Sequence, residues 1–306
     1  MSEIVVSVCV ITYNHCNYIR QCLDGILMQQ VDFPIEIVIN DDCSTDGTTE
    51  IIKEYEKNYP ELFKATYQTE NQYSKGVRGM FARFCFPKAI GKYIALCEGD
   101  DYWTDPLKLQ KQVDFLEENS GYVMCSHECN SYIQSSGECF SCGFANGRDY
   151  SITNLINGEW AYQTLSVVFR GDQLNLSVLN KYEICVDLVI FYELLRNGGQ
   201  GRQLKDIMGV YRIHEGGVWS LMDMNAKREQ EFRVRMAIYQ VVPNEDSAKL
   251  LLGIWNKPIS RKWLILNPFI IIKCICVFIV HFGITFTFKV LYRKFILGRV
   301  NVSNVG

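Results

Sequence analysis

Three carboxylates occur within four residues in Glu98-Gly99-Asp100-Asp101, directly after the apolar run Tyr93 to Cys97. Like charges this close repel one another unless a cation holds them together, and a hard divalent ion such as Mg²⁺ or Mn²⁺ prefers carboxylate ligands. An ion bound here would share its coordination sites with a phosphate and make a diphosphate a better leaving group. The alternative for these residues is a solvated acidic turn that caps the next helix.

A second polar cluster, Asn40 to Thr48, follows the apolar run Ile35 to Ile39. Its side chains are of the types that close turns and cap helices, and we expect Ser44 to Thr48 to cap the helix that follows. Asp41 or Asp42 would then face a cleft and accept a hydrogen bond from an N–H group of a base. An ordinary turn with a helix cap would need the same residues.

Thr12, Tyr13 and Asn14 form a third cluster, after the β-branched run Val5 to Ile11. The Tyr13 ring is able to stack on a flat ligand, although an aromatic side chain at a strand end is more often simply packed.

These clusters have to be positioned by alternating strands and helices. Continuous apolar runs of strand length indicate strands buried on both faces, and apolar residues at helical spacing indicate the helices between them. We expect strands at 5–11, 35–39, 64–68, 93–97, 122–127 and 164–169 and helices at 18–27, 48–58, 80–89, 105–119, 187–197 and 225–239. The alternation predicts an α/β fold with a doubly wound, mainly parallel sheet, in which ligands bind at the carboxyl ends of the strands.

Composition and charge limit the kinds of partner that the protein is expected to bind. The chain has 306 residues, 48% of them hydrophobic and 21% charged, which is a globular balance. Residues 1–256 carry 23 basic against 34 acidic groups, whereas residues 257–306 carry eight basic groups and no acidic one. The acidic body predicts no nucleic-acid partner. The basic, apolar tail points to a membrane surface.

The thirteen cysteines do not form the framework of a small secreted domain. The first residues have neither the basic region nor the cleavage site of a signal peptide, so we expect a cytoplasmic chain with reduced thiols. A structural zinc site is an alternative role for five residues of the next segment, and same-face burial on a strand competes with it; these are Cys125, His127, Cys129, Cys139 and Cys142.

Three segments together resemble the signatures of family 2 glycosyltransferases, the inverting enzymes of the GT-A fold, of the type that acts in bacterial polysaccharide synthesis. They are 8–14, 40–48 and 95–103, and the resemblance extends over about residues 5–220. It implies a Rossmann-like GT-A domain that binds a nucleotide-sugar donor. A UDP-sugar is the donor that the family favours, with GDP and dTDP donors as alternatives. Glu98 stands where the motif commonly has Asp, which leaves the metal preference open.

The resemblance also implies site residues. The base of the donor would contact Thr12, Tyr13, Asn14 and Asp41 or Asp42, whereas the ribose and an Mn²⁺- or Mg²⁺-bound diphosphate would contact Glu98, Asp100, Asp101 and His214. Glu98, Asp100, Asp101 and His214 are the implied metal ligands. The last of them lies in the segment Tyr211 to Ser220, which resembles the family's closing loop, and a surface histidine is the alternative.

An inverting transfer needs a general base, which the family keeps at the start of a helix. Asp187 fits this position, and a helix N-cap is its alternative role; Glu183 and Asp172 are weaker candidates. Arg78 and Arg83 are candidates for phosphate contacts or, more simply, solvated helix positions.

We expect three parts: 1–121 as the nucleotide-sugar-binding half, 122–256 as the acceptor-side half with a closing helix, and 257–306 as a membrane-associating tail with apolar, basic helices. The stretch Phe269 to Phe288 is long enough to span a bilayer, but His281 and basic flanks on both sides favour a partly inserted anchor at the cytoplasmic face. A buried soluble helix is the third possibility.

The sequence therefore predicts a metal-dependent inverting glycosyltransferase that transfers a sugar to a saccharide or lipid-linked glycan at the inner face of a membrane, in the synthesis of cell-surface polysaccharide. The alternatives are an inactive nucleotide-sugar-binding scaffold and a sugar nucleotidyltransferase, which would need a Gly-rich basic loop that Thr12 to His15 does not provide. A Gly-x-Gly-x-x-Gly dinucleotide motif is also absent there.

Overall fold

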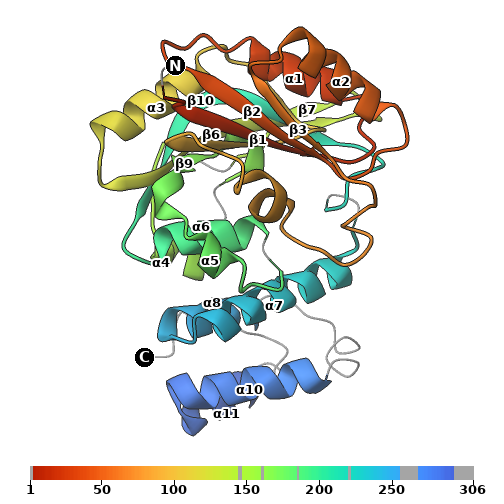
Figure 1. The fold of residues 1–306 in the computed structure, drawn as a ribbon. Coiled ribbons are helices and arrows are strands. Elements are labelled where there is room, and N and C mark those ends of the chain that lie inside the picture. Colours follow the sequence, from red (N-terminus) through yellow and green to blue (C-terminus); the bar gives the residue numbers. More distant parts are fainter. Residues whose placement is uncertain are drawn as a thin grey trace. The chain divides into compact units, whose positions relative to one another are not determined.

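A computed structural model describes residues 3–143, 147–159, 162–184, 186–219, 222–255 and 268–292 (Figure 1). All the predicted site residues lie in these ranges, whereas 256–267 and 293–306 of the predicted tail, and Ser220 of the predicted closing segment, lie outside them. The chain forms two compact units, one of residues 1–152 and 160–217 and the other of residues 153–159 and 218–306.

The first unit is built on one sheet whose strand order is β3-β2-β1-β4-β9-β6-β10-β5. Parallel pairs join β1 to β2 and β4, β2 to β3, and β6 to β10. The strands in chain order are β1 Val6–Thr12, β2 Ile35–Asp41, β3 Phe63–Tyr67, β4 Tyr93–Glu98, β5 Tyr102–Trp103, β6 Tyr122–Ile133, β7 Cys139–Ser141, β8 Asp149–Tyr150, β9 Val168–Arg170 and β10 Gln200–Ile213. The predicted mainly parallel sheet is confirmed.

Helices cover both faces of this sheet, as expected for a doubly wound fold. Figure 1 shows α1 and α2 over one face and α6 on the other. The helical elements of this unit are α1 Ile19–Leu27, α2 Thr48–Asn58, the π-helix Phe81–Cys85, α3 Lys108–Glu118, α5 Leu176–Leu179 and α6 Asp187–Leu195, with 3₁₀ turns at Thr164–Ser166 and Gly171–Gln173. Apolar side chains of β1, β2 and β4 fill the core against α1, α2 and α3.

Three predicted elements differ from the structure. The expected helix 80–89 is the five-residue π-helix Phe81–Cys85 followed by a turn. The expected strand 164–169 is a 3₁₀ turn followed by the short strand β9, which runs antiparallel to both β4 and β6. The helix expected from Asp105 begins at Lys108, because the Asp105 carboxylate accepts a hydrogen bond from the N–H of Leu107 at 2.8 Å and closes a separate turn first.

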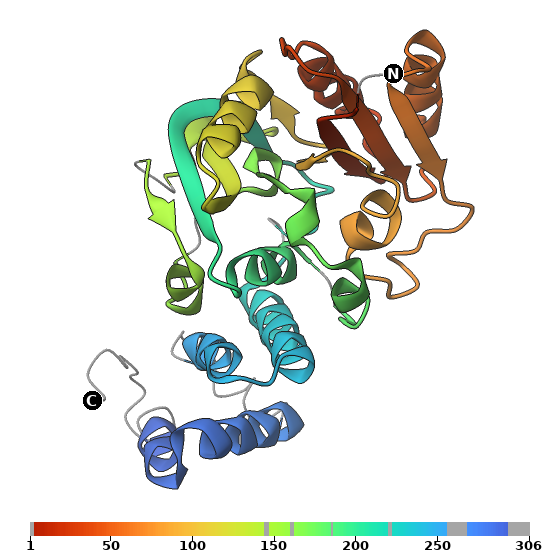
Figure 2. The ribbon, with the colours of Figure 1, turned by 60° about the vertical axis from the view of Figure 1, so that its left-hand side comes forward.

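Strand β10 is long and irregular, and Figure 2 shows it as the bent strand beside β6. Its register against β6 shifts three times along its length. It ends at Ile213, so that it carries the next residue, His214, to the same sheet edge as the carboxyl end of β4.

The elements described in the second unit are helices. They are α4 Ile152–Ile156, whose first residue belongs to the sheet unit, α7 Met224–Val241, α8 Glu245–Trp255, α10 Pro268–Phe282 and α11 Ile284–Tyr292. Apolar residues such as Phe232, Leu251, Phe278 and Val290 form its core, and the Tyr239 hydroxyl lies 2.8 Å from Nε2 of His281. Among the helices of residues 3–255 and 268–292, none meets the length and apolarity that a bilayer crossing needs.

Candidate active site

The three polar clusters meet at one edge of the sheet. In the parallel register, Thr12 pairs with Asp41 and Ile11 pairs with Glu98, so β1, β2 and β4 end side by side. The strand ends are tied together, since the N–H of Gly99 donates to the Ile11 carbonyl at 2.9 Å. A Cβ on Gly99 would lie 2.6 Å from Oγ1 of Thr12, so this close approach needs glycine.

His15, Asp100 and His214 form a compact cluster at this edge. Each offers one ligand atom, and these three atoms all lie within 4.8 Å of one another. Oδ2 of Asp100 is 3.0 Å from Nε2 of His214 and 3.7 Å from Nε2 of His15. The loops after β1, β4 and β10 each supply one member of the cluster.

Neighbouring groups orient both imidazoles. Nδ1 of His15 lies 3.1 Å from Oγ1 of Thr12, which directs Nε2 of His15 toward Asp100. Nδ1 of His214 accepts a hydrogen bond from the N–H of Gly216 at 3.2 Å. In the neutral ring this leaves the proton on Nε2 of His214, which donates it to Asp100.

The electrostatics of the cluster favour an ionised Asp100. Burial alone would raise the pKa of Asp100, but the hydrogen bond from His214 and the proximity of His15 outweigh it and lower the pKa. Burial lowers the pKa of His15 in spite of the nearby Asp100 carboxylate. The site thus combines one anionic oxygen ligand with an imidazole that stays neutral at physiological pH.

Glu98 lies beside this cluster, and its carboxyl group has a raised pKa. Burial raises its pKa to about 8, helped by the charges of Asp100 and Asp187. The charge of Asp187 acts on Glu98, which indicates that the start of α6 faces the same site.

Asp101 is the one carboxylate of this motif that the structure turns into the interior. It is 1% exposed, and its Oδ1 accepts a hydrogen bond from the N–H of Arg212 at 2.8 Å. Burial and the charges of Asp100 and Glu98 raise its pKa well above the usual value. The structure does not bring Asp101 into the His15–Asp100–His214 cluster.

Arg212 is a site residue that the sequence analysis missed. Its guanidinium donates to the Asp100 carbonyl at 2.8 Å and to Gln21 at 2.6 Å, and it lies over the rings of Tyr18 and Tyr102 at 4.9 and 5.0 Å. Arg212 therefore fixes the acidic motif to the end of β10, two residues before His214. His15 was also missed, although its position three residues after Thr12 in the same polar turn was a usable signal.

The loop after β2 is held by its own carboxylates. Asp41 accepts hydrogen bonds from the N–H of Ser44 at 3.1 Å and from the hydroxyls of Ser44 and Thr49. Asp42 accepts two backbone N–H groups of the loop after β3, at 2.8 and 3.0 Å. Both side chains are buried, so they stabilise the loops around the site rather than stand free in a cleft.

Asn14 and Tyr13 differ in their surroundings. Asn14 has a positive φ of 54°, and its side-chain oxygen accepts a hydrogen bond from the N–H of Thr45 at 2.9 Å. Tyr13 is 42% exposed. The expected helix cap is supplied by Asp46, whose Oδ1 accepts from the N–H of Thr48 at 3.0 Å, while Gly47 at φ 100° occupies the N-cap position.

Asp187 is the first residue of α6, and Val186 rather than Asp187 occupies the N-cap position. Its Oδ1 accepts from the N–H of Leu188 at 2.7 Å and its Oδ2 lies 3.5 Å from the Thr164 hydroxyl. Burial raises its pKa. Glu183 and Asp172, the weaker candidates for the base, are both exposed.

Neither arginine occupies a solvated helix position. Arg78 lies in the loop before the π-helix, with its guanidinium 3.8 Å from the centre of the Tyr73 ring. Arg83 lies in the π-helix itself and donates to the carbonyls of Arg78 at 2.9 Å and Tyr182 at 3.1 Å. In the structure, both guanidinium groups therefore contact other groups of this chain.

The cysteine segment shows no metal geometry. Within the described ranges, the one group of His, Cys, Asp and Glu residues with ligand spacing is His15, Asp100 and His214. Cys125 and Cys129 are buried on β6, whereas Cys139 is exposed on β7. Burial on a strand therefore accounts for the first two cysteines.

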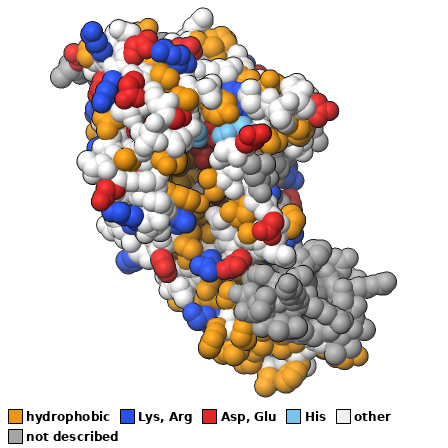
Figure 3. All heavy atoms as spheres, turned by 90° about the vertical axis from the view of Figure 1, so that its right-hand side faces the viewer, with side chains coloured by type: hydrophobic (Ala, Val, Ile, Leu, Met, Phe, Trp, Pro, Cys, Tyr) orange, Lys and Arg blue, Asp and Glu red, His pale blue; other side chains and the backbone are white. Residues whose placement is uncertain are grey.

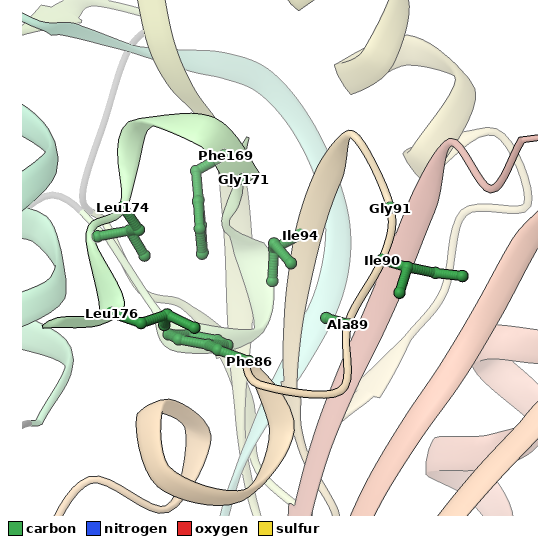
Figure 4. Close-up of a pocket in the computed structure, with 9 residues that line it drawn as sticks. All are labelled: Phe86, Ala89, Ile90, Gly91, Ile94, Phe169, Gly171, Leu174 and Leu176. Carbon is green, nitrogen blue, oxygen red and sulfur yellow. The ribbon is translucent and has the colours of Figure 1, made fainter. Parts of the chain in front are cut away.

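An apolar pocket of about 190 Å³ lies elsewhere on the sheet (Figure 4). Its lining includes Gly91 and Ile94, near the amino end of β4, together with Phe169 of β9. It is thus at the opposite end of β4 from Glu98. Figure 3 shows histidine side chains next to acidic ones at a hollow in the face that it presents.

Comparison with known proteins agrees with this fold. The sequence model of "Glycosyl transferase family 2" matches residues 7–136. Among solved structures, a fragment of Staphylococcus aureus TarS in complex with UDP-GlcNAc matches with a TM-score of 0.62 at 20% identity, over 90% of this chain and 79% of that one. A mannosyltransferase of Pyrobaculum calidifontis in complex with GDP-Man and Mn²⁺ matches with a TM-score of 0.54 at 17% identity, over 96% and 80% of the two chains. These likenesses confirm the predicted GT-A fold.

Relatives in sequence extend the comparison. An uncharacterized protein of Mycobacterium tuberculosis is 37% identical over 220 residues, which are 70% of this chain, and the chain spans about 60% of the length of that relative. The Escherichia coli UDP-Glc:alpha-D-GlcNAc-diphosphoundecaprenol beta-1,3-glucosyltransferase WfaP is 28% identical over 70% of this chain and 79% of its own length. A glycosyltransferase of Nostoc is 32% identical over 76% of this chain and 72% of its own length. A match of that identity and extent, added to the family match over the three polar clusters, shows that the chain belongs to glycosyl transferase family 2.

Proposed function

We propose that this glycosyltransferase inverts the anomeric centre as it moves a sugar from a nucleotide-diphosphate donor, a UDP-sugar, to a hydroxyl of a saccharide or lipid-linked glycan in cell-surface polysaccharide synthesis. The observation that carries the proposal is the convergence of His15, Asp100 and His214 beside Glu98 and Asp187 at the carboxyl ends of the strands. TarS, in its complexes with UDP and UDP-GlcNAc, and WfaP, by its name, support a UDP donor.

The cluster fits a divalent cation. Asp100 supplies an ionised oxygen, and His15 and His214 supply imidazole nitrogens from two other loops. Because Mg²⁺ is held through oxygen and imidazole suits transition metals, Mn²⁺ fits these residues better than Mg²⁺. A cation bound there would neutralise the diphosphate of the donor and so make it a better leaving group.

The other predicted donor contacts divide into two kinds. Tyr13, being exposed beside the strand ends, offers a ring on which a base is able to stack. Thr12, Asn14, Asp41 and Asp42 shape the walls of the site through their hydrogen bonds to neighbouring loops. Glu98, within electrostatic reach of Asp100, lies where it is able to contact the ribose or the diphosphate of the donor.

Asp187 is proposed as the general base. The oxygen of the acceptor hydroxyl attacks the anomeric carbon, the bond from that carbon to the diphosphate oxygen breaks, and the hydroxyl proton moves to the Asp187 carboxylate. Burial suits this role, because a carboxylate with a raised pKa is a stronger base. Its position at the start of α6, within electrostatic reach of Glu98, supports the assignment.

The acceptor and the location of the protein belong to the same proposal. The name of WfaP identifies its acceptor as a sugar on diphosphoundecaprenol, a lipid carrier. An acceptor of this class, with the eight basic and no acidic residues of 257–306, supports action at the cytoplasmic face of a membrane. The division into a donor half of residues 1–121, an acceptor half of 122–256 and a membrane tail of 257–306 is proposed on the same grounds.

The test is thermal unfolding of the full chain against a panel of UDP-, GDP- and dTDP-sugars, with and without Mn²⁺. A donor at one hundred times its Kd is expected to stabilise the fold by about 2.7 kcal/mol, which shifts the Tm by several degrees. The shift should require Mn²⁺ and should be lost in Asp100→Asn. Asp172→Asn, which changes an exposed carboxylate in the same way, is the matched control. A folded chain that no nucleotide sugar stabilises would contradict the proposal.

A further inference from the structure

Helix α10 is apolar on two opposite sides. Cys274, Val277 and Phe278 are buried in the core of the helical unit. Phe269 and Val280 point away from that core and are 80% and 74% exposed. A surface helix of a globular protein normally presents polar residues on its outer side. Because the outer side of α10 is apolar, it would be more stable in contact with an apolar environment than with water.

Helix α11 continues this surface. Ile284, Phe288 and Tyr292 recur at four-residue spacing and are 59%, 66% and 59% exposed, while Thr287 and Val290 are buried on the opposite side. Gly283, at φ 81°, joins the two helices in a conformation that other residues rarely adopt. We call the exposed apolar residues of both helices the outer face: Phe269, Ile272, Ile279, Val280, Ile284, Phe288 and Tyr292.

Within the described residues, neither helix is long enough to cross a bilayer. Helix α10 has 15 residues and α11 has nine. At about 1.5 Å per residue they measure roughly 22 and 14 Å, against about 30 Å of hydrocarbon core. A broad apolar face on short helices is suited to lying in the plane of a membrane interface, where aromatic and aliphatic side chains enter the acyl boundary.

The charge of the same segment selects the kind of membrane. Lys273 and Lys289 are exposed on α10 and α11, at the border of the outer face. Residues 257–306 carry eight basic groups and no acidic one. Lysine stems are able to run along an apolar surface and place their ammonium groups among lipid phosphates. Figure 3 shows hydrophobic side chains gathered at the lower end of the view, where α10 and α11 lie.

We infer that the outer face of α10 and α11 binds an anionic lipid surface, with both helices lying in the interface rather than crossing it. The inference rests on the proposed function, because an enzyme that acts on a lipid-linked acceptor has to bind at a membrane surface. Its test requires neither donor nor acceptor, so the failure of one proposal is distinguishable from the failure of the other.

The experiment is flotation of the purified full chain with vesicles of phosphatidylcholine alone or mixed with phosphatidylglycerol. The chain should float with the anionic vesicles, and alkaline carbonate should release it, as expected for a protein that lies on the bilayer. Val280→Asp and Phe288→Asp should each weaken partition at least about tenfold, because each replaces an apolar contact with a charge. Lys273→Gln combined with Lys289→Gln should reduce the preference for anionic over neutral vesicles.

Ile90→Asp and Ile207→Asp are matched controls, since these apolar residues of the sheet unit are 62% and 49% exposed. They should leave flotation unchanged, and circular dichroism should verify that all variants are folded. Two results would overturn the inference. One is a chain that stays with the soluble fraction in both lipid mixtures. The other is a dimer in light scattering that Val280→Asp and Phe288→Asp dissociate, which would assign the outer face to a second copy.

Discussion

At the scale of single residues, the reaction depends on which carboxylates are ionised. As the proposed base, Asp187 has to lose its proton before it is able to act, and burial raises its pKa. The transfer rate should therefore fall as the pH drops through this raised pKa and reach a plateau above it.

In Asp187→Asn, turnover should fall by about 10²- to 10⁴-fold while the affinity for the donor is kept. Initial rates across pH, with donor affinity from calorimetry, check both; loss of donor binding in the variant would remove Asp187 from this role.

A second residue-scale prediction concerns Thr12, which contacts His15, one of the proposed metal ligands. Its Oγ1 lies 3.1 Å from Nδ1 of His15. Thr12→Val keeps the size of the side chain but removes this partner, so the imidazole loses its fixed orientation. Groups that orient metal ligands typically account for 10- to 100-fold in metal affinity.

Titration of the metal-free chain with Mn²⁺, followed by electron paramagnetic resonance, measures this loss directly. His15→Gln and His214→Gln should each weaken Mn²⁺ binding at least as much as Thr12→Val does. Thr45→Val is a control from the loop after β2, since Thr45 lies outside the cluster and its backbone N–H, which the change keeps, donates to Asn14. Unchanged Mn²⁺ affinity in His15→Gln would show that His15 is not a ligand.

The sequence predicted the acidic motif but not which of its carboxylates would be exposed to a ligand. Asp100 and Asp101 are neighbours in the chain, and adjacent residues at a strand end point in different directions. In the structure, Asp100 faces His214 while Asp101 turns inward to the backbone of Arg212. Arg212 lies on β10 and His214 directly after it, more than a hundred residues later. The family resemblance implied that His214 joins Asp100, whereas the contact between Asp101 and Arg212 is revealed only by the tertiary fold.

At the scale of elements, helix α3 carries an unusual buried charge. Lys108, its first residue, is 0% exposed, and its Nζ lies 3.9 Å from the centre of the Trp103 ring without a hydrogen-bond partner among the described residues. Burial lowers its pKa from 10.5 to about 7. In the unfolded chain this group keeps its proton up to its ordinary pKa, so the unfolded state binds the extra proton between pH 7 and 10.5.

The stability of the natural chain should consequently rise with pH across that window as far as Lys108 is concerned. Lys108→Met, which keeps the length of the side chain, should be more stable than the natural chain at pH 7, and its advantage should shrink as the pH approaches 10. Urea unfolding at several pH values measures this difference. Lys111→Met on the same helix removes an exposed lysine that is paired with Asp105 and Asp206, and it should show no such pH-dependent gain. A destabilised Lys108→Met at pH 7 would contradict the prediction.

Local patterns predicted most elements, because the apolar pattern of each buried strand and each amphipathic helix of the sheet unit lies within one continuous segment of the sequence. The predicted limits of the second helix, Thr48 to Asn58, are confirmed. The position of the short strand β9 in the sheet could not be predicted from the sequence. It consists of three residues that pair antiparallel with β4 and β6. Its conformation depends on those partners and not on its own pattern.

At the scale of the whole molecule, charge is divided along the chain. Residues 1–256 carry a net excess of acidic groups, and residues 257–306 carry only basic ones. An anionic membrane should attract the second segment and repel the first, so the sum of the two sets the affinity of the full chain. Each basic group near such a surface contributes about 1 kcal/mol, and salt screens this attraction within a Debye length of about 10 Å at 0.1 M.

The full chain should therefore bind phosphatidylglycerol vesicles less tightly as the salt concentration rises, and then level off where apolar contacts of the outer face alone hold it. Lys273→Gln with Lys289→Gln should flatten the salt dependence and leave the high-salt level unchanged, whereas Phe288→Asp should lower that level. Sedimentation with vesicles over a series of salt concentrations separates the two contributions. If Phe288→Asp instead altered only the slope, electrostatics alone would hold the chain on the membrane, and the apolar face of α10 and α11 would need another partner.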